Sequence, residues 1–318
     1  MIGALPKAYK HLKVVVIAMS LVGQSQPALA QLPREPLYVI NANVLDGLSP
    51  EVVRGATIVI SGGKIDRIDT GTPTVPPGVG VVDVQGRYVV PGLIDAHSHV
   101  SDLTGVRRAL ESGVTTIRTA GVRGFADVGI RDLVKGGFLE GPDIVTTGIF
   151  VTPDIGNAVL WDERLHELHL TGVETEEELR KLVRINIDHG VDWIKTRTTD
   201  RAGLAERDPR TQIYTEQQIR VIVDEASRAG ISVMVHAHGN AGVRAAVLGG
   251  AKSIEHGTYA SEETLQLMVE HGTYLVPTLS SISSFGTTGT YSDPALYLRG
   301  LHMAPRRRGV ARRAHELG

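Results

Sequence analysis

The sequence contains no cysteine among its 318 residues, so disulfide bonds and thiolate metal ligands are excluded. Any metal site must use histidine, carboxylates or similar groups. A strong charge bias is also absent, because 33 Lys and Arg oppose 35 Asp and Glu for a formal net charge of −2. This balance gives no reason to expect nucleic acid or an acidic surface as a partner. The length and the 42% hydrophobic content allow one large domain and a small one.

The N-terminus lacks an apolar run long enough to cross a bilayer. Val14 to Val22 is apolar but too short to span it, and three lysines between positions 7 and 13 precede it. Ala28-Leu29-Ala30 then offers an A-x-A cleavage site. The pattern predicts a signal peptide over residues 1–30, a secreted or periplasmic protein, and no membrane attachment after cleavage. The missing cysteines agree with an oxidising compartment.

Short alternating segments separated by turn signals follow the predicted leader. Leu37–Val44, Ala56–Ile60 and Val81–Val84 have the pattern of strands, and Ser61–Lys64 that of a tight hairpin. These features predict a small N-terminal β-sandwich module over residues 31–88. Its core is too small for an independent domain.

From Val89 the pattern changes to alternating strands and helices, which is typical of a parallel α/β sheet covered by helices. Helices are predicted over Glu176–His189 and Thr215–Ala229, the second with a capping box at its start. We expect a (β/α)₈ TIM-type barrel over residues 89–318. Seven βα units are counted where a closed barrel needs eight, so the last strand is expected to be missing through C-terminal truncation. The predicted strands are Val89–Ala96, Thr115–Ala120, Asp143–Thr147, Trp193–Thr196, Ser232–His236, Ser253–His256 and Tyr274–Thr278.

Four histidines and one lysine lie at the C-terminal ends of these strands, where parallel barrels place their chemistry. In His97-Ser98-His99 the two imidazoles are two residues apart, so in a strand both point to the same face. Neutral imidazoles that converge form a site for a divalent transition metal, most often zinc. The five residues are His97, His99, Lys195, His236 and His256.

The string that contains the first pair, Val-Val-Pro-Gly-Leu-Ile-Asp-Ala-His-Ser-His at 89–99, resembles the first-strand signature of the amidohydrolase superfamily of metal-dependent hydrolases. The resemblance extends in order over nearly the whole chain after the leader. It is strongest to the imidazolonepropionase-like branch that includes the Xaa-Pro dipeptidases. The further motifs are Gly113–Arg118, Gly141-Pro142, Trp193–Lys195, Val235–Gly239 and Ser253–Gly257.

The resemblance implies a site with two zinc ions. The pair at 97 and 99 would bind one ion, His236 and His256 would bind the other, and a carbamylated Lys195 would bridge them. A carbamate is an anion whose two oxygens can each take one metal, whereas an ammonium cannot bind a cation. The alternative for Lys195 is a surface lysine packed on Trp193. Strand alternation does not separate His236 from His238, and the resemblance makes the first a ligand and the second a catalytic residue of the pocket.

Carboxylates near the predicted site are given other roles. Glu255 is expected to point to the side of the strand opposite His256 and to orient a neighbouring ligand. Asp95 is expected to point away from the ligand face. The resemblance implies an aspartate at the end of strand eight as general base, and neither Asp200 nor Asp293, which lie outside strand ends, is a convincing counterpart.

These observations predict a hydrolase of amide-type C–N bonds, linear as in Xaa-Pro or cyclic, that uses a metal-bridging hydroxide. The expected partner is a small molecule or dipeptide, and the sequence leaves homo-oligomer formation open. Two alternatives remain: a truncated, inactive fragment, or a mononuclear cyclic-amide hydrolase with unmodified Lys195. A basic run near the C-terminus is interpreted as a solvated helix face rather than a nucleic-acid site; it comprises Arg306, Arg307, Arg308, Arg312 and Arg313.

Overall fold

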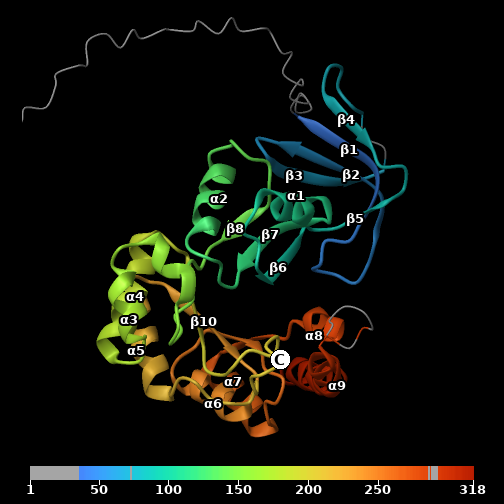
Figure 1. The fold of residues 1–318 in the computed structure, drawn as a ribbon. Coiled ribbons are helices and arrows are strands. Elements are labelled where there is room, and N and C mark those ends of the chain that lie inside the picture. Colours follow the sequence, from blue (N-terminus) through green and yellow to red (C-terminus); the bar gives the residue numbers. More distant parts are fainter. Residues whose placement is uncertain (1–35, 72–73, 286, 288–292) are drawn as a thin grey trace, which may run out of the picture. The chain divides into compact units, whose positions relative to one another are not determined.

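The structure, a computed structural model, describes residues 36–71, 74–285, 287 and 293–318 (Figure 1). The predicted signal peptide over residues 1–30 lies outside this range. The chain divides after Pro91 into two compact units, which are described separately below. Each helix in the described part of the chain is too short or too polar to span a bilayer.

The N-terminal unit is built on one five-stranded sheet. Its strand β1 pairs antiparallel with β2 and parallel with both β4 and β5. The β2–β3 hairpin turns at Gly62-Gly63, both at positive φ, as tight hairpin turns require. The predicted sandwich is not confirmed, because the strands described in this unit form a single sheet. They are β1 (Leu37–Val44), β2 (Val53–Ser61), β3 (Lys64–Thr70), β4 (Gly80–Asp83) and β5 (Tyr88–Val89).

The strand expected over Val89–Ala96 is wrong in its first half. Tyr88–Val89 pairs with β1 in the N-terminal unit, and the first strand of the second unit is β6 (Leu93–Ser98). Pro91 lies between them and has no N–H to donate to a ladder. The single strand predicted from this apolar segment is therefore divided between two sheets.

The second unit contains parallel strands in two groups, ordered β6-β7-β8 and β12-β11-β10-β9. A bridge between Val151 and Thr196 joins β9 to the segment that follows β8. The parallel α/β architecture is thus confirmed. The described residues supply seven such strands, with exposed apolar side chains on the first and the last, Ile94 at 72% and Tyr274 at 66%. After β6 they are β7 (Val114–Thr119), β8 (Asp143–Val145), β9 (Trp193–Arg197), β10 (Ser232–Ala237), β11 (Ser253–His256) and β12 (Tyr274–Val276).

Helices follow the strands in this unit, and their ends carry the expected capping residues. Thr215 forms a capping box with Gln218, as its sequence pattern predicts, and Thr175 forms another with Glu178. In Figure 1, α4 and α5 lie side by side, as do α8 and α9. The helices are α1 (Leu103–Glu111), α2 (Ala126–Lys135), the 3₁₀ helix η1 (Gly156–Trp161), α3 (Leu165–Thr171), α4 (Glu176–Asp188), α5 (Glu216–Ser227), α6 (Asn240–Leu248), α7 (Glu262–His271), α8 (Leu279–Phe285) and α9 (Pro294–Leu317).

The main apolar core lies between β9–β11 and the helices α4–α7. These strands are buried along most of their length, because parallel strands are covered by helices on the outside. This core fixes the ends of β9, β10 and β11, which carry Lys195, His236 and His256. Its fully buried side chains include Leu182, Ile194, Ile222, Val235 and Ile254.

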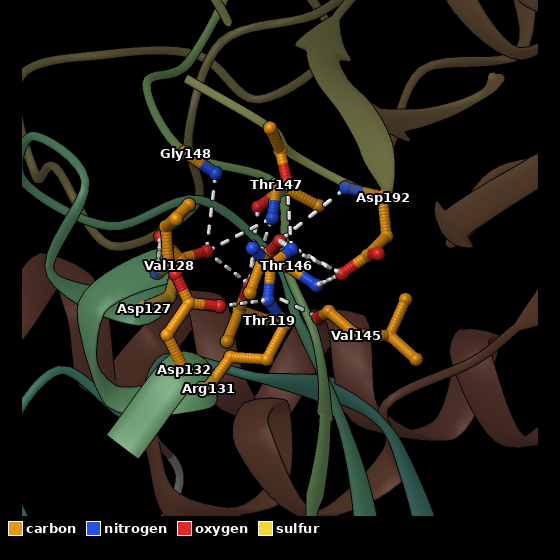
Figure 2. Close-up of polar contacts among 11 residues, drawn as sticks. Thr119, Asp127, Val128, Arg131, Asp132, Val145, Thr146, Thr147, Gly148 and Asp192 are labelled. Atoms are coloured by element: carbon orange, nitrogen blue, oxygen red, sulfur yellow. Dashed lines mark hydrogen bonds and ion pairs between the residues drawn. The ribbon is translucent and has the colours of Figure 1, made fainter. Parts of the chain in front are cut away.

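A buried polar network joins β7, β8 and the start of α2 (Figure 2). Asp127 is 0% exposed, and its Oδ2 accepts hydrogen bonds from the Thr119 hydroxyl at 2.6 Å and from the amides of Thr147 and Gly148 at 2.9 and 3.1 Å. Its Oδ1 accepts from the Val128 amide at 2.9 Å. One carboxylate therefore satisfies four donors at the ends of two strands and a helix.

Replacing Asp127 with Ala should lower the free energy of unfolding by about 3 kcal/mol, because it leaves buried donors without an acceptor. Chemical denaturation followed by circular dichroism measures this loss. The exposed neighbour on the same helix, Asp132→Ala, serves as control and should change it by less than about 0.5 kcal/mol. Equal effects of the two substitutions would contradict the role given to the network.

Candidate functional site

All of the predicted site residues line one cavity of about 370 Å³ in the second unit. They come from β6, β9, β10 and β11 or from the residue or two that follow them, at the C-terminal ends of the strands. Parallel strands bring these ends to one edge, which accounts for the convergence of residues far apart in the sequence. The six are His97, His99, Lys195, His236, His238 and His256.

The imidazoles of the cavity lie in contact with one another. The ring of His256 is central, with its centroid 4.9 Å from that of His97, 4.6 Å from His236 and 4.7 Å from His238. His97 and His99 are 5.2 Å apart. His236, His238 and His256 each offer a ring nitrogen within 4.8 Å of the others, a grouping that can hold a metal ion. The structure therefore places His238 with the predicted ligands.

Glu255 lies behind this cluster and is 0% exposed. Its Oε2 accepts a hydrogen bond of 2.5 Å from His97 Nδ1, and its Oε1 accepts from Arg118 at 3.0 Å and from the Ser253 hydroxyl at 2.8 Å. A carboxylate accepts only, so the proton lies on Nδ1 and the Nε2 lone pair of His97 stays available. Glu255 thus fixes the orientation and tautomer of His97.

Glu255 contacts His97 from outside the cavity, as expected of a residue that orients a neighbouring ligand, whereas His256 contacts the same ring from within it. His256 has φ of 80°, in the left-handed region that residues with a side chain rarely adopt. The alternation of a regular strand is broken at this residue. Strained backbone of this kind is concentrated at functional sites.

Each of the other four histidines also uses one ring nitrogen in a hydrogen bond with the protein. In the described structure this leaves the second nitrogen of each ring for a ligand. The contacts are His99 Nδ1 with the Gly121 carbonyl at 2.9 Å, His236 Nε2 with the Asp200 carbonyl at 3.1 Å, His238 Nδ1 with the Thr258 hydroxyl at 2.9 Å, and His256 Nδ1 with the Thr278 hydroxyl at 2.6 Å.

Burial keeps these imidazoles neutral. Desolvation and the positive charge of Lys195 together lower the pKa of His97 to about 4, against the opposing effect of Glu255. Desolvation also lowers the pKa of His236 and His256 well below the usual value. Neutral imidazoles have the free lone pair that a metal ion requires.

Lys195 is 1% exposed, and its Nζ has no hydrogen-bond partner in the described structure. It lies 5.3 Å from the centroid of the Phe150 ring. Burial lowers the pKa of this amine to about 8. A surface lysine packed on Trp193 is therefore excluded. Buried polar groups are normally hydrogen-bonded, so this amine without a partner is an exception that the function of the site must explain.

Three acidic residues considered from the sequence have defined places. Asp95 was expected to point away from the ligand face, but it lines the same cavity, and its Oδ1 accepts from the His97 amide at 3.0 Å. Asp200 contributes its carbonyl oxygen to His236. Asp293 caps α9 by accepting from the Ala295 amide at 2.8 Å.

Arg307 is the site residue that sequence reasoning missed. It was included in a solvated basic face, but it is 1% exposed and lines the cavity. It donates to the Thr258 hydroxyl at 3.0 Å and the Thr278 carbonyl at 3.1 Å, and a guanidinium nitrogen lies 3.4 Å from His238 Nδ1. Helical spacing could have revealed it, because it continues the buried face of α9 set by Gly300 and Met303.

Residues 88–291 match the family model described as the amidohydrolase family. The chain belongs to the amidohydrolase family. The superfamily identified from the sequence motifs is thereby confirmed. The chain is 27% identical over 314 residues to ochratoxinase from Aspergillus niger, in an alignment that covers 84% of this chain and 64% of that protein. It therefore spans less than two thirds of the length of this curated relative.

Solved structures of other family members have the same fold. A Xaa-Pro dipeptidase with methionine bound in its active site is 26% identical with a TM-score of 0.77, covering 89% of this chain and 77% of that one. A prolidase complexed with N-methylphosphonate-L-proline is 25% identical with a TM-score of 0.74, covering 88% and 76%. The structure of A. niger ochratoxinase, at 24% identity and a TM-score of 0.70, agrees in fold.

Glu255→Gln should destabilise the protein by about 3 kcal/mol, because it leaves the half-buried guanidinium of Arg118 without its anion. Thermal unfolding measured by calorimetry reports this as a lower melting temperature. Glu270→Gln changes an exposed residue of α7 and should leave the temperature unchanged. A Glu255→Gln protein as stable as the wild type would show that the carboxylate does not hold the cluster together.

Proposed function

We propose that the chain is a zinc-dependent hydrolase that cleaves amide-type C–N bonds in small molecules or dipeptides. The observation that carries this proposal is the partnerless, buried Nζ of Lys195 in a cavity lined by five histidines. The relatives support the substrate class, since they include an ochratoxinase and a Xaa-Pro dipeptidase. A prolidase-like activity on a linear dipeptide is the leading form, and hydrolysis of a cyclic amide is the second.

The donor set fits two zinc ions. His97 and His99 would hold one, and His236 and His256 the other, each through the ring nitrogen that the protein leaves unbonded. A carbamate on Lys195 would join the two positions. Bound zinc supplies a Lewis acid that polarises the scissile carbonyl and acidifies water.

The residues around the metal positions orient the substrate and the ligands. Glu255 holds the ring of His97 through its Nδ1 proton. Arg307 and Thr258 hold Nδ1 of His238, which leaves Nε2 of that catalytic ring for the substrate. Because His238 is buried, only groups that enter the cavity can contact its ring.

A mononuclear cyclic-amide hydrolase is the second candidate. The grouping of His236, His238 and His256 within 4.8 Å favours it, because three imidazoles can hold one ion with Lys195 unmodified. The two candidates differ in the number of zinc ions bound per chain and in the effect on activity of replacing Lys195.

Under the binuclear proposal, wild-type protein should bind two zinc ions per chain and hydrolyse glycyl-L-proline. Lys195→Ala should bind fewer ions and lose roughly 10³-fold in turnover, because metal assistance is worth several kcal/mol. Added formate or propionate should restore part of the activity by replacing the carbamate oxygens. Mass spectrometry of bound zinc and a proline-release assay measure both effects, with the exposed Lys135→Ala as control.

Other outcomes decide between the alternatives. One zinc per wild-type chain, with full activity on a cyclic amide such as hydantoin in Lys195→Ala, would replace the binuclear proposal with the mononuclear one. Zinc binding without hydrolysis of either substrate would favour the inactive alternative.

The signal-peptide pattern supports export as part of the proposal. Expression of the full sequence in a bacterium should yield a periplasmic or secreted protein whose N-terminus is Gln31, after cleavage of residues 1–30. N-terminal sequencing of the protein from each cell fraction checks this. An uncleaved protein that stays in the cytoplasm would contradict it.

A further inference from the structure

One arginine of α9 binds four backbone carbonyl oxygens of the loop that joins β9 to α5. The guanidinium of Arg299 donates from Nη1 to the carbonyls of Ala202 and Leu204 at 2.6 and 2.7 Å. From Nη2 it donates to the carbonyls of Ala205 and Arg207 at 3.1 and 2.7 Å. A guanidinium presents five N–H donors in a fixed plane, so this single side chain holds six consecutive residues of the loop.

The segment that carries these carbonyls, the loop tip at residues 201–207, forms part of the wall of the histidine cavity. Arg201, Ala202 and Gly203 all line the cavity. The buried Ala202 also belongs to an apolar cluster that contains Ile282 of α8. Because Ile282 lines the cavity as well, the loop tip and α8 form adjoining parts of its wall.

The base of the same loop has a support that does not involve Arg299. The amide of Asp200 donates to the carbonyl of Thr211 at 3.0 Å, which joins the two ends of the loop. The carbonyl of Asp200 in turn contacts the ring of His236 at 3.1 Å. The predicted metal ligand and the loop tip are therefore held by different hydrogen bonds.

Hydrogen bonds inside the loop tip do not attach it to α9. The amide of Arg207 donates to the carbonyl of Leu204 at 3.1 Å, which turns the chain locally. Arg299 supplies the attachment to the helix, and its charge makes these hydrogen bonds stronger than those between neutral groups. Segments with few tertiary contacts open more easily than the elements that they connect. Loss of the guanidinium should therefore release the loop tip and leave the base of the loop in place.

We propose that Arg299 is a positioning residue that holds the loop tip in place as a wall of the histidine cavity. The wall determines how closely the cavity encloses a substrate, whereas His236 keeps its own support through Asp200. Arg299 thus acts on substrate binding, and so on KM, rather than on the chemical step. This inference rests on the proposed amide hydrolysis and adds to it a residue of α9 outside the cavity lining.

Arg299→Met keeps the apolar stem of the side chain and removes its donors. With glycyl-L-proline as substrate it should raise KM about tenfold, the effect of one lost hydrogen bond to a charged group, while kcat stays within about threefold of the wild type. Bound zinc, measured by mass spectrometry, should not change. Arg299→Lys should restore part of the wild-type KM, because its ammonium reaches only some of the carbonyls. Arg308→Met removes an exposed arginine of the same helix and should change neither constant.

Limited proteolysis tests the attachment of the loop tip without any use of hydrolase activity. Trypsin cleaves after arginine, and the loop tip contains Arg201 and Arg207, both exposed. Because cleavage requires local opening of the chain, trypsin should cut Arg299→Met at these two positions about tenfold faster than the wild type or Arg308→Met. Mass spectrometry of the fragments identifies the bonds that are cut. An equal increase at sites throughout the chain would indicate general destabilisation and would overturn the proposal.

The outcomes separate this inference from the proposed function. If Arg299→Met hydrolyses the dipeptide with unchanged KM and is cut no faster, the positioning role is wrong and the hydrolase proposal stands. A lower kcat with loss of zinc at constant KM would also overturn the role, because the arginine would then act on the metal ligands. If the wild type hydrolyses nothing but Arg299→Met is cut faster at the loop tip alone, the attachment by Arg299 stands and the hydrolase proposal fails.

Discussion

The geometry of the candidate site depends on one buried carboxylate that stays ionised. Burial alone would raise the pKa of Glu255, but the hydrogen bond from His97 and the positive charges of Lys195 and Arg118 lower it overall. As an anion it accepts from three donors at once and sets the proton position on the first histidine. The cluster is therefore organised around a negative charge that lies outside the cavity itself.

Much of this arrangement could be predicted from the sequence. Each histidine follows a short apolar, β-branched segment, and parallel strands end at one edge, so order along the chain translates into proximity in space. The capping boxes and the hairpin glycines mark element ends for equally local reasons. Strand alternation also accounts for Asp95, which lies two residues before His97 and so shares its face, contrary to the expectation stated above.

Other features depended on long-range pairing that no local pattern reveals. Val89 belongs to the sheet of the N-terminal unit because it pairs with Val44, a partner forty-five positions earlier. Helical spacing marks Arg307 as part of the buried face of α9, but it does not reveal the hydroxyls that Arg307 contacts, on Thr258 and Thr278, which come from distant segments.

The ring of Phe150 lines the histidine cavity, and it packs close to the backbone because Gly121 has no side chain. A Cβ on Gly121 would come within 2.3 Å of that ring, and the backbone there has φ of 96°, which favours glycine. The carbonyl of the same glycine holds His99. A side chain at position 121 would therefore disturb the Phe150 ring and the histidine that its carbonyl holds at the same time.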